Sequence, residues 1–315
     1  MFLTGKRILL AKEESTYGTD PTPVVASNAI DAEKIEISYE GDVLERNPVR
    51  GYLSPVAPAG IGKRSVKLSF DVELKGSGSA GTAAKLGDLL EACGFAETVS
   101  AGSAVSYAPS SGAIKSVTFY LYDLQDSGSC VLHKVKGARG TMQLNAAAGQ
   151  IAKFSFTFNG LYELPTDAAA PSAPTYESTK PPVVESAQVT LNGVSSLVVS
   201  EVSLDMQNNI VASDDVNAAT GISKFALTGR KPTGKIAPEA VLLATYDFWT
   251  DWKNAAERAA SLIIGATAGN IITISLPKLT IDSIAGGDRN GILTRDLPFR
   301  ASANAGNDEV SIIFT

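Results

Sequence analysis

The sequence is poor in the residues that most often carry out chemistry. Its 315 residues include one histidine and two cysteines. Because Cys93 and Cys130 are far apart, they give neither a disulfide framework nor, with a single histidine, a zinc site, and folding in a reducing cytoplasm is expected. A catalytic triad needs a base, and no serine or cysteine stands out as a partner of His133. We therefore expect no metal, no cofactor and no active site.

Charge is also scarce. The 27 Lys and Arg residues against 33 Asp and Glu residues give a net charge of −6, and charged residues make up 19% of the chain, below the roughly 25% of ordinary soluble domains. An acidic balance disfavours tight binding to phosphate backbones. A chain that is 44% hydrophobic and low in charge favours burial of surface against neighbours, so assembly is expected.

Long apolar runs are missing as well. The longest are short stretches such as Leu262–Ile264, against the roughly 18 residues that a membrane span requires. Near the N-terminus, the apolar segment Ile8–Ala11 is followed at once by the charged Lys12–Glu14, which is too early for a secretory signal. Neither a transmembrane helix nor a membrane partner is expected.

What the sequence does contain is alternation with a period of two. In Ser65–Lys75, apolar residues such as Val66 and Leu68 alternate with polar ones such as Lys67 and Ser69, the pattern of a half-buried strand. The same pattern, rich in β-branched and aromatic residues, recurs in Ile35–Tyr39, Val117–Leu121, Phe154–Phe158, Val202–Met206, Ile272–Leu276 and Val310–Phe314. The predicted fold class is mainly β, with antiparallel sheets.

Two stretches have the spacing of a helix. Leu86–Cys93 carries apolar residues at i, i+3, i+4 and i+7, and Gly94 follows as a C-terminal stop. In the second half, a stripe runs from Trp249 and Trp252 to Ile263 before Gly265. This spacing predicts a second helix whose tryptophans pack on a sheet.

A proline-rich segment divides the chain. Leu164–Pro182 holds five of the 15 prolines among small and polar residues, which is typical of a linker. We expect a first module at residues 1–166, a linker at 167–182 and a second module at 183–315.

The order of predicted elements is the same in both halves, which predicts two tandem β-sandwich or barrel modules with one flanking helix each. The offset between matched residues is 167 for Ile37 and Leu204, 153 for Leu74 and Leu227, and 156 for Phe156 and Ile312. The decrease of 14 places a longer loop in the first half, at Gly41–Arg64. Such a long structureless segment inside a compact domain favours a function, and we interpret it as an arm that reaches a neighbour.

One motif suggests an enzyme. Gly76–Gly81 matches the dinucleotide-binding pattern G-x-G-x-x-G between a strand and a helix, with Glu97 about twenty residues on. However, a strand in that fold is buried on both faces, and Lys67 and Asp71 would place charges in the helix layer. A strand-to-helix turn explains the glycines better, and a nucleotide-binding enzyme stays as an alternative.

Other acidic motifs carry no site either. Asp288–Gly291 begins like an EF-hand loop, but Phe299 occupies the twelfth position, where a carboxylate is needed. The segment is better interpreted as a hairpin turn. Adjacent carboxylates at Glu13–Glu14 and Asp214–Asp215 do not converge as an acid and a base must.

An ordered set of segments resembles the major tail tube proteins of long-tailed bacteriophages. In the first half these are Glu45-Arg46, Arg50–Leu53, Gly62–Arg64 and Leu86–Phe95, and in the second they are Leu227–Gly234, Tyr246–Phe248 and Leu297–Phe314. The second set is similar to the second module of duplicated tube proteins. The resemblance covers nearly the whole chain from Ile8 onward.

The resemblance implies a structural virion protein rather than an enzyme. In that family, strands of neighbouring modules join into a ring of sheet around a channel, and the rings stack into a tube through which DNA passes. Six modules form a ring, so three chains of two modules each would close one with pseudo-sixfold symmetry. Another ring-forming tail subunit or a pilus-like subunit is the structural alternative.

The same resemblance implies partners and a location. The partners are further copies of this chain, a tape measure protein, a tail terminator protein and a distal tail protein, with DNA in transient, non-specific passage. The protein would be assembled in the host bacterial cytoplasm and reside in the virion tail.

Two groups of residues are candidates for roles in such a tube. The channel wall should not hold DNA, so acidic and polar strand faces are expected to include it, although alternation does not tell the inner face from the outer one. The lumen candidates are Glu36, Ser38, Asp71, Glu73, Glu201 and Asp205. The candidates for contacts between stacked rings are the basic residues of the arm, Arg46, Arg50, Lys63 and Arg64.

Overall fold

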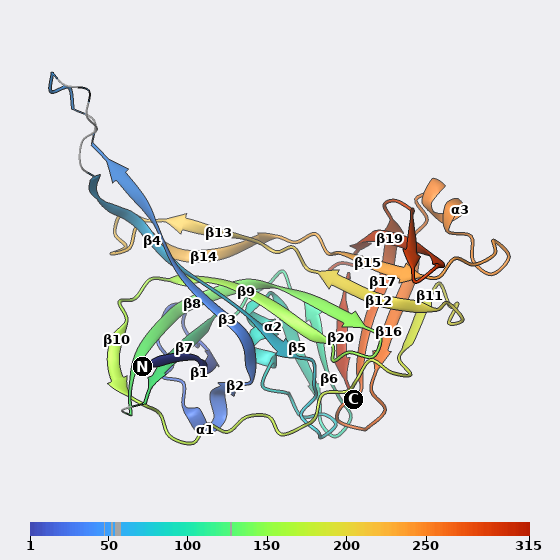
Figure 1. Cartoon of the computed structure of the whole chain (residues 1–315), viewed down its shortest axis with the longest axis horizontal. Helices are drawn as coiled ribbons and strands as arrows, with labels where there is room; N and C mark the ends of the chain where they lie inside the picture. Colours follow the sequence, from blue (N-terminus) through green and yellow to red (C-terminus); the bar gives the residue numbers. More distant parts are fainter. Residues whose placement is uncertain (47, 52, 54–57, 127) are drawn as a thin grey trace.

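The protein is mainly β, as the sequence predicts. The structure is a computed structural model that describes residues 1–46, 48–51, 53, 58–126 and 128–315. Three short helices, α1 (Val25–Asn28), α2 (Gly87–Ala92) and α3 (Phe248–Lys253), accompany the strands of this described part. Figure 1 shows an elongated molecule with a hairpin that projects from one end.

The strands follow the chain in two groups. The first group is β1 (Phe2–Glu13), β2 (Ala29–Ile30), β3 (Ala32–Glu45), β4 (Pro58–Glu73), β5 (Phe95–Ser100), β6 (Ala104–Pro109), β7 (Val117–Gln125), β8 (Ser129–Ala147), β9 (Lys153–Leu161) and β10 (Thr166–Ala169). The second group is β11 (Gln188–Leu191), β12 (Val199–Asp205), β13 (Asn209–Asp214), β14 (Ile222–Gly229), β15 (Thr233–Pro238), β16 (Arg258–Ile264), β17 (Ile272–Ile281), β18 (Ala285–Arg289), β19 (Ile292–Ser302) and β20 (Ser311–Phe314).

Strand pairing has the same order in the two halves. In the first half the antiparallel order is β3-β4-β9-β8-β7-β1. In the second half it is β12-β15-β19-β17-β16-β11. Helix α2 follows β4 along the chain and α3 follows β15. Each half therefore contains a six-stranded sheet with its helix at the same point of the connection.

The register agrees as well. Across four strands, the residues opposite one another are Ile37, Leu68, Phe158 and Gly140 in the first half, and Leu204, Gly234, Phe299 and Ile281 in the second. The pairing order thus matches β16 with β7 and β17 with β8. These correspondences differ from those of the sequence comparison, which matches the β17 segment with the β7 segment.

The expected difference in loop length is not observed. Ile37 pairs with Leu68, 31 residues later, and Leu204 pairs with Gly234, 30 residues later. In the second half, residues between β12 and β15 form a further hairpin, β13–β14, in which Leu227 lies opposite Ile210. Leu227 therefore belongs to this extension and does not correspond to Leu74.

The described base of the arm, residues 41–45 and 58–64, is a pair of strands rather than a structureless loop, and residues 47, 52 and 54–57 of the arm lie outside the described part of the chain. Strands β3 and β4 stay paired from Ala32 and Val72 out to Glu45 and Pro58, with irregularities along the way. Its glycines and prolines hide this pairing in the sequence, because they weaken the alternating pattern. Figure 1 shows the hairpin leaving the body of the molecule beyond the β13–β14 hairpin.

The second helix is shorter than its spacing predicts. Helix α3 ends at Lys253, Ala255 has a φ of 46°, and Ile263 lies in β16. The tryptophans do not pack in the core, since Trp249 is 38% and Trp252 48% exposed. Trp252 Nε1 instead donates to Asp282 O at 3.1 Å. In contrast, α2 lies within its expected range, and Gly94 follows it with a φ of 86°.

The two halves are joined by strand pairing. Residues 143–147 of β8 pair with Glu201–Asp205 of β12, and β20 pairs with residues 105–107 of β6. The sheet is therefore continuous across the chain, and one cluster of buried apolar residues draws on both halves, with Phe156 and Phe299 as examples. The expected linker begins with β10, which pairs with residues 129–132 of β8.

The glycine-rich motif has a packing role between the halves. Gly76 N donates to Asn270 Oδ1 at 2.7 Å, and Gly78 N donates to Gly269 O at 3.1 Å. A Cβ atom on Gly76 would lie 2.1 Å from Gly269 O. Because the approach of two backbones explains these glycines, they need no bound nucleotide to account for them.

Candidate assembly surfaces

The six residues expected for a channel wall lie on one face of the sheet. Residues directly opposite one another on paired strands share a face, and one such row reads Asp71, Ser155, Gln143, Asp205 and Thr233 across β4, β9, β8, β12 and β15. The next row reads Glu73, Lys153, Asn145, Ser203 and Lys235. The rows cross from the first half to the second without a break.

The remaining candidates extend this surface at two places. Glu36 and Ser38 of β3 lie opposite Ser69 and Lys67 of β4, which alternate with Asp71 on the same face. Glu201 lies two residues before Ser203 on β12. We call the surface formed by these rows and residues the polar face. The opposite face is apolar and contains buried residues of the core.

Some acidic groups on and beside the polar face are paired with cations. Lys34 Nζ lies 2.9 Å from Asp71 Oδ2, and Lys153 Nζ lies 2.6 Å from Glu33 Oε2. Partial burial opposes ionisation of Asp71, but hydrogen bonds from Ser155 and Lys34 outweigh it and lower the pKa of that carboxyl. Among the described residues, Glu36, Glu201 and Asp205 have no cation within 4.0 Å.

The arm exposes apolar side chains. Val43 is 65% and Ile61 63% exposed, and Leu44 is half exposed. A hairpin surrounded by water gains nothing from such residues, whereas exposed apolar patches commonly mark contacts with other proteins. The arm is therefore suited to packing against another surface.

The basic residues of the arm have different surroundings. Arg46 and Arg50 are exposed beyond the end of β3. Lys63 Nζ lies 2.5 Å from Asp214 Oδ2, and Arg64 Nη2 donates to Ala219 O at 3.0 Å. The second pair therefore holds the arm against the β13–β14 hairpin of the same chain, which leaves the first pair to face outward.

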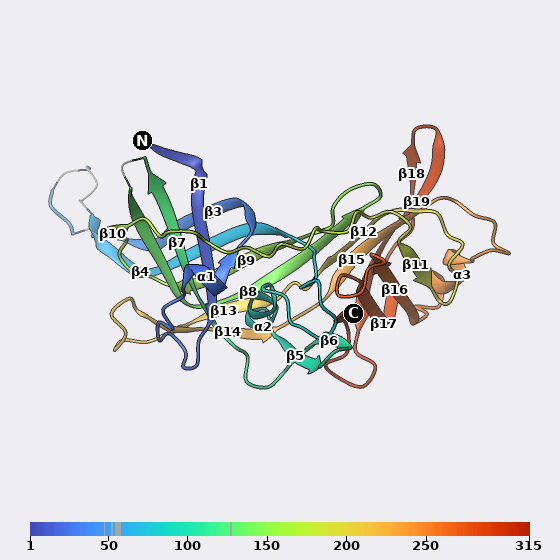
Figure 2. The same ribbon diagram turned by 90° about the horizontal axis from the view of Figure 1, so that it is seen from below.

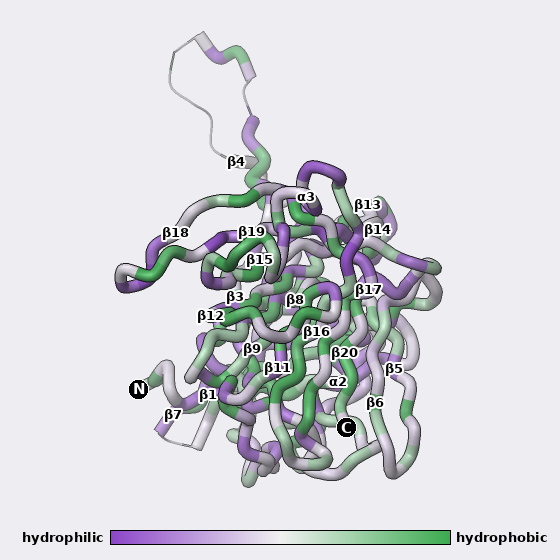
Figure 3. Tube along the Cα trace, turned by 90° about the vertical axis from the view of Figure 1, so that its right-hand side faces the viewer, coloured by the Kyte–Doolittle hydropathy of each residue, from purple (hydrophilic) through white to green (hydrophobic). Residues whose placement is uncertain are grey.

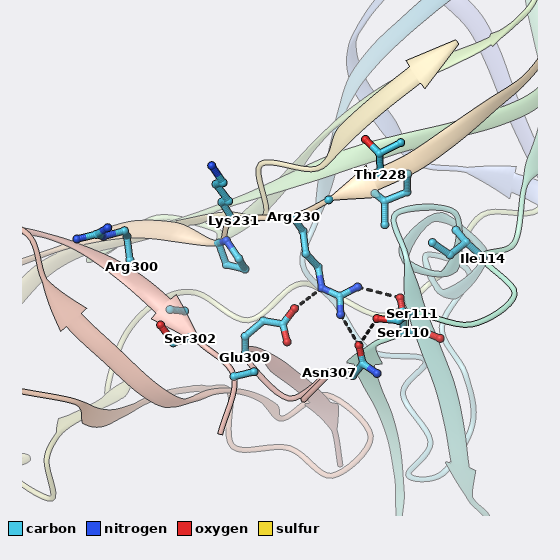
Figure 4. A pocket seen from close by; sticks show the side chains of 15 residues that line it. Ser110, Ser111, Ile114, Thr228, Arg230, Lys231, Arg300, Ser302, Asn307 and Glu309 are labelled. Carbon is cyan, nitrogen blue, oxygen red and sulfur yellow. Dashed lines mark hydrogen bonds and ion pairs between the residues drawn. The ribbon is translucent and has the colours of Figure 1, made fainter. Parts of the chain in front are cut away.

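A polar network that the sequence does not reveal centres on Arg230 (Figure 4). Arg230 Nη1 donates to Ser110 O at 2.8 Å, Nη2 donates to Asn307 Oδ1 at 2.6 Å, and Nε pairs with the Glu309 carboxylate. The network lines a hollow of about 780 Å³. Because Ser110 follows β6 and Glu309 precedes β20, the guanidinium ties the first half to the second.

A cluster of carboxylates lies beside α2. Glu13, Asp88 and Glu91 bring carboxylate oxygens within 4.8 Å of one another, the spacing that could hold a cation. Lys115 pairs with Glu13 and already supplies a positive charge. Burial, followed by the neighbouring Glu13, raises the pKa of Glu91 to about 7.

The lone histidine has a structural position. His133 Nδ1 and Tyr39 Oη are 2.7 Å apart, and His133 Nε2 lies 3.3 Å from Asp123 Oδ2. Asp123 also pairs with Arg7 Nε at 2.8 Å. The group links β3, β8, β7 and β1, and both cysteines are buried elsewhere.

The projecting hairpin and the open edges of β3 and β18 are features that allow an antiparallel fold to associate with further chains. Residues 5–301 match the family model described as phage tail tube protein, so the chain belongs to this family. The resemblance to phage tail tube proteins is thereby confirmed, and the family is a structural one, not an enzyme family, whose members belong to the virion tail. A search of curated proteins found no match. None of the helices formed by the described residues could span a membrane.

Removing the Arg230 side chain should destabilise the protein. Glu309 is 8% exposed, and Arg230→Met leaves its charge buried without a partner, which should lower the free energy of unfolding by about 3 kcal/mol in urea denaturation. Arg230→Met with Glu309→Gln should recover part of this loss, because no unpaired charge remains. Equal losses in the single and double variants would contradict this role.

Replacing Glu91 should change how stability depends on pH. A pKa raised from 4.5 to about 7 means that ionisation is less favourable in the folded state, so wild-type stability is lost as pH rises through this window. Glu91→Gln should therefore be more stable than wild type by about 1 kcal/mol at about pH 8, and by less at about pH 5. Solvent screens the partly exposed carboxylate, which keeps the difference at pH 8 this small. Denaturant unfolding at both pH values tests this, with the exposed Glu201→Gln as control. The same difference at both pH values would refute it.

Proposed function

We propose that this chain polymerises into stacked rings that form the tube of a phage tail, through which DNA passes. The observation that carries this proposal is the repeat of one six-stranded order in both halves, joined within the chain by the pairing of the C-terminal end of β8 with the edge strand β12. A unit that already pairs with a copy of its own fold can continue the same pairing with further copies. Two duplicated modules per chain and six modules per ring give a trimeric ring with pseudo-sixfold symmetry.

In this arrangement the polar face lines the channel. Its rows cross the junction between the halves unbroken, as a wall shared by successive modules requires. Paired charges keep it from gripping phosphates, and the unpaired Glu36, Glu201 and Asp205 leave a repulsive excess. Weak contact allows DNA to slide.

The arm connects stacked rings. Its exposed apolar residues, Val43 and Ile61 among them, would be covered by the next ring, and Arg46 and Arg50 would meet acidic residues there. The ends of the tube would contact a tape measure protein, a tail terminator protein and a distal tail protein, and assembly would occur in the host bacterial cytoplasm before the tail is completed.

Electron microscopy of the concentrated, purified chain tests the proposal directly. We expect rings of three copies that stack into tubes, with class averages showing six similar lobes. Rings of six copies would contradict the trimer. A protein that stops at single rings would instead be a tail-tip or other ring subunit, and a protein that stays monomeric would overturn the assembly.

Shortening the arm should separate ring formation from stacking. Deleting residues 48–60 removes the tip and leaves the pairing of β3 with β4 next to the body of the molecule, so the melting temperature should change little. We expect rings or monomers that do not elongate, seen by negative stain and sedimentation. Tubes of normal length from this variant would count against the role of the arm.

Reversing a charge on the polar face should make the tube retain DNA. Tubes of Glu201→Lys should co-sediment several-fold more short duplex DNA than wild-type tubes at low salt, and the difference should vanish as salt is raised. Glu185→Lys changes an exposed glutamate in the segment before β11 and serves as the matched control. If both variants retain equal amounts of DNA, the polar face does not line the channel.

A further inference from the structure

The junction inside the chain provides a template for a junction between chains. At this internal junction, the C-terminal end of β8 pairs with the edge strand β12, with Leu144 opposite Leu204 and Gln143 opposite Asp205. The same end of β8 is held on its other side by β9, where Leu144 lies opposite Phe154. It thus lies between a strand of its own half and a strand of the next.

Each partner of this junction has a counterpart elsewhere in the chain. Strand β3 takes the place of β12 in the shared strand order, with Ile37 matching Leu204. Strand β18 takes the place of the end of β8, because it pairs with β19 as that end pairs with β9. Phe158 of β9 matches Phe299 of β19, so Phe154 and Arg295, each four residues earlier, also match. Leu144 lies opposite Phe154 and Gly286 lies opposite Arg295. Gly286 therefore matches Leu144.

Both counterparts have an open edge. Among the described residues, β3 pairs only with β4, and β18 pairs only with β19. Figures 2 and 3 show the β18–β19 hairpin projecting from the body of the molecule. Asn290 and Gly291, with φ of 53° and 85°, form its tight turn, as the sequence predicts. The backbone N–H and C=O groups along an open edge strand can pair with a strand of another chain.

The edge of β3 also has room beside it. A groove of about 530 Å³ opens on the polar face beside this edge, and it is lined by Ile35–Ser38 and Glu40 on β3, by Lys67 and Ser69 on β4 and by Arg7 on β1. Arg7 Nη1 donates to Ile35 O at 3.0 Å, so a backbone acceptor of this edge is bonded to a side chain instead of a strand. At the internal junction, the position beside β12 is occupied by the end of β8.

We propose that β18 of one copy pairs antiparallel with β3 of a second copy, in the register of the internal junction. Gly286 then lies opposite Ile37, Ala285 opposite Ser38 and Gly287 opposite Glu36. The occupant of the groove is a second copy of this chain, because the template and both edges belong to it. This pairing rests on the proposed function in one respect, because it is the contact that closes the proposed ring.

Charge and size agree with this register. Arg289, which pairs with Glu239 of its own chain, falls diagonal to Glu36. Glu36 has no cation partner among the described residues, and diagonal neighbours are within reach of long side chains, so Arg289 can interact with both carboxylates. Asp288 falls opposite Ile35, next to the guanidinium of Arg7. The two glycines of β18 present little bulk where the strand enters the groove.

Disulfide trapping tests the register. Ser38 and Ala285 are both exposed, so Ser38→Cys with Ala285→Cys should fold as wild type, which a melting curve checks. Residues directly opposite on antiparallel strands come close enough for a disulfide. Oxidation of assembled protein should give a ladder of linked chains on a non-reducing gel that ends at three copies. The matched control is Glu40→Cys with Ala285→Cys, which shifts one cysteine by two residues.

The outcomes separate the pairing from the tube. We expect about tenfold more linked chain from the opposite pair than from the shifted pair, because only the former meets disulfide geometry. Rings or tubes in the micrographs without preferential linkage would overturn the pairing and leave the proposed function standing. A ladder that ends at six copies would support the pairing and overturn the trimer. Chains that form neither rings nor links would overturn both.

Discussion

The arrangement of the molecule depends on the pairing of the end of β8 with β12. Backbone N–H and C=O groups of a strand need partners, and here two halves of one chain supply them to each other over residues 143–147 and 201–205. This pairing fixes the register of every row on the polar face. It also brings the loops of the two halves together, so that Gly76 meets Gly269 and Arg230 reaches Ser110. The junction is thus supported at several independent points.

The same strand pairing leaves two edge strands of the described part of the chain without a second partner strand. In the sheet that carries the polar face, the two halves joined by β8 and β12 leave one unmatched edge at each end, which in this chain are β3 and β18. A single copy cannot pair these edges with each other without bending into a closed ring of two units. Closure by several copies pairs both of these edges with the geometry already present inside the chain, so this contact needs no new kind of strand pairing.

The sequence predicts local features of this fold well, and it predicts poorly the features that depend on residues far apart in the chain. The alternation around Leu68 and Phe156 marks strands because burial on one face imposes a period of two. The helix at Trp249 is overextended in the prediction because its spacing continues by chance into β16. The correspondence of Leu204 with Ile37 is visible, but that of Gly234 with Leu68 is not, since cross-strand register depends on residues far apart. Arg230 gives no signal, because its partners Ser110 and Glu309 are distant in the chain.

Net charge alone does not describe the polar face. The chain carries −6 in total, yet Asp71 and Glu33 on or beside this face are paired with Lys34 and Lys153. A wall of unpaired carboxylates would repel its own neighbours when modules close into a ring, which costs stability. Ion pairs remove that repulsion while keeping the surface hydrated. Among the described residues, the unpaired acids Glu36, Glu201 and Asp205 outnumber Lys67, an exposed cation of this face that forms no ion pair. A surface of nearly balanced charge can therefore still discourage phosphates without opposing its own assembly.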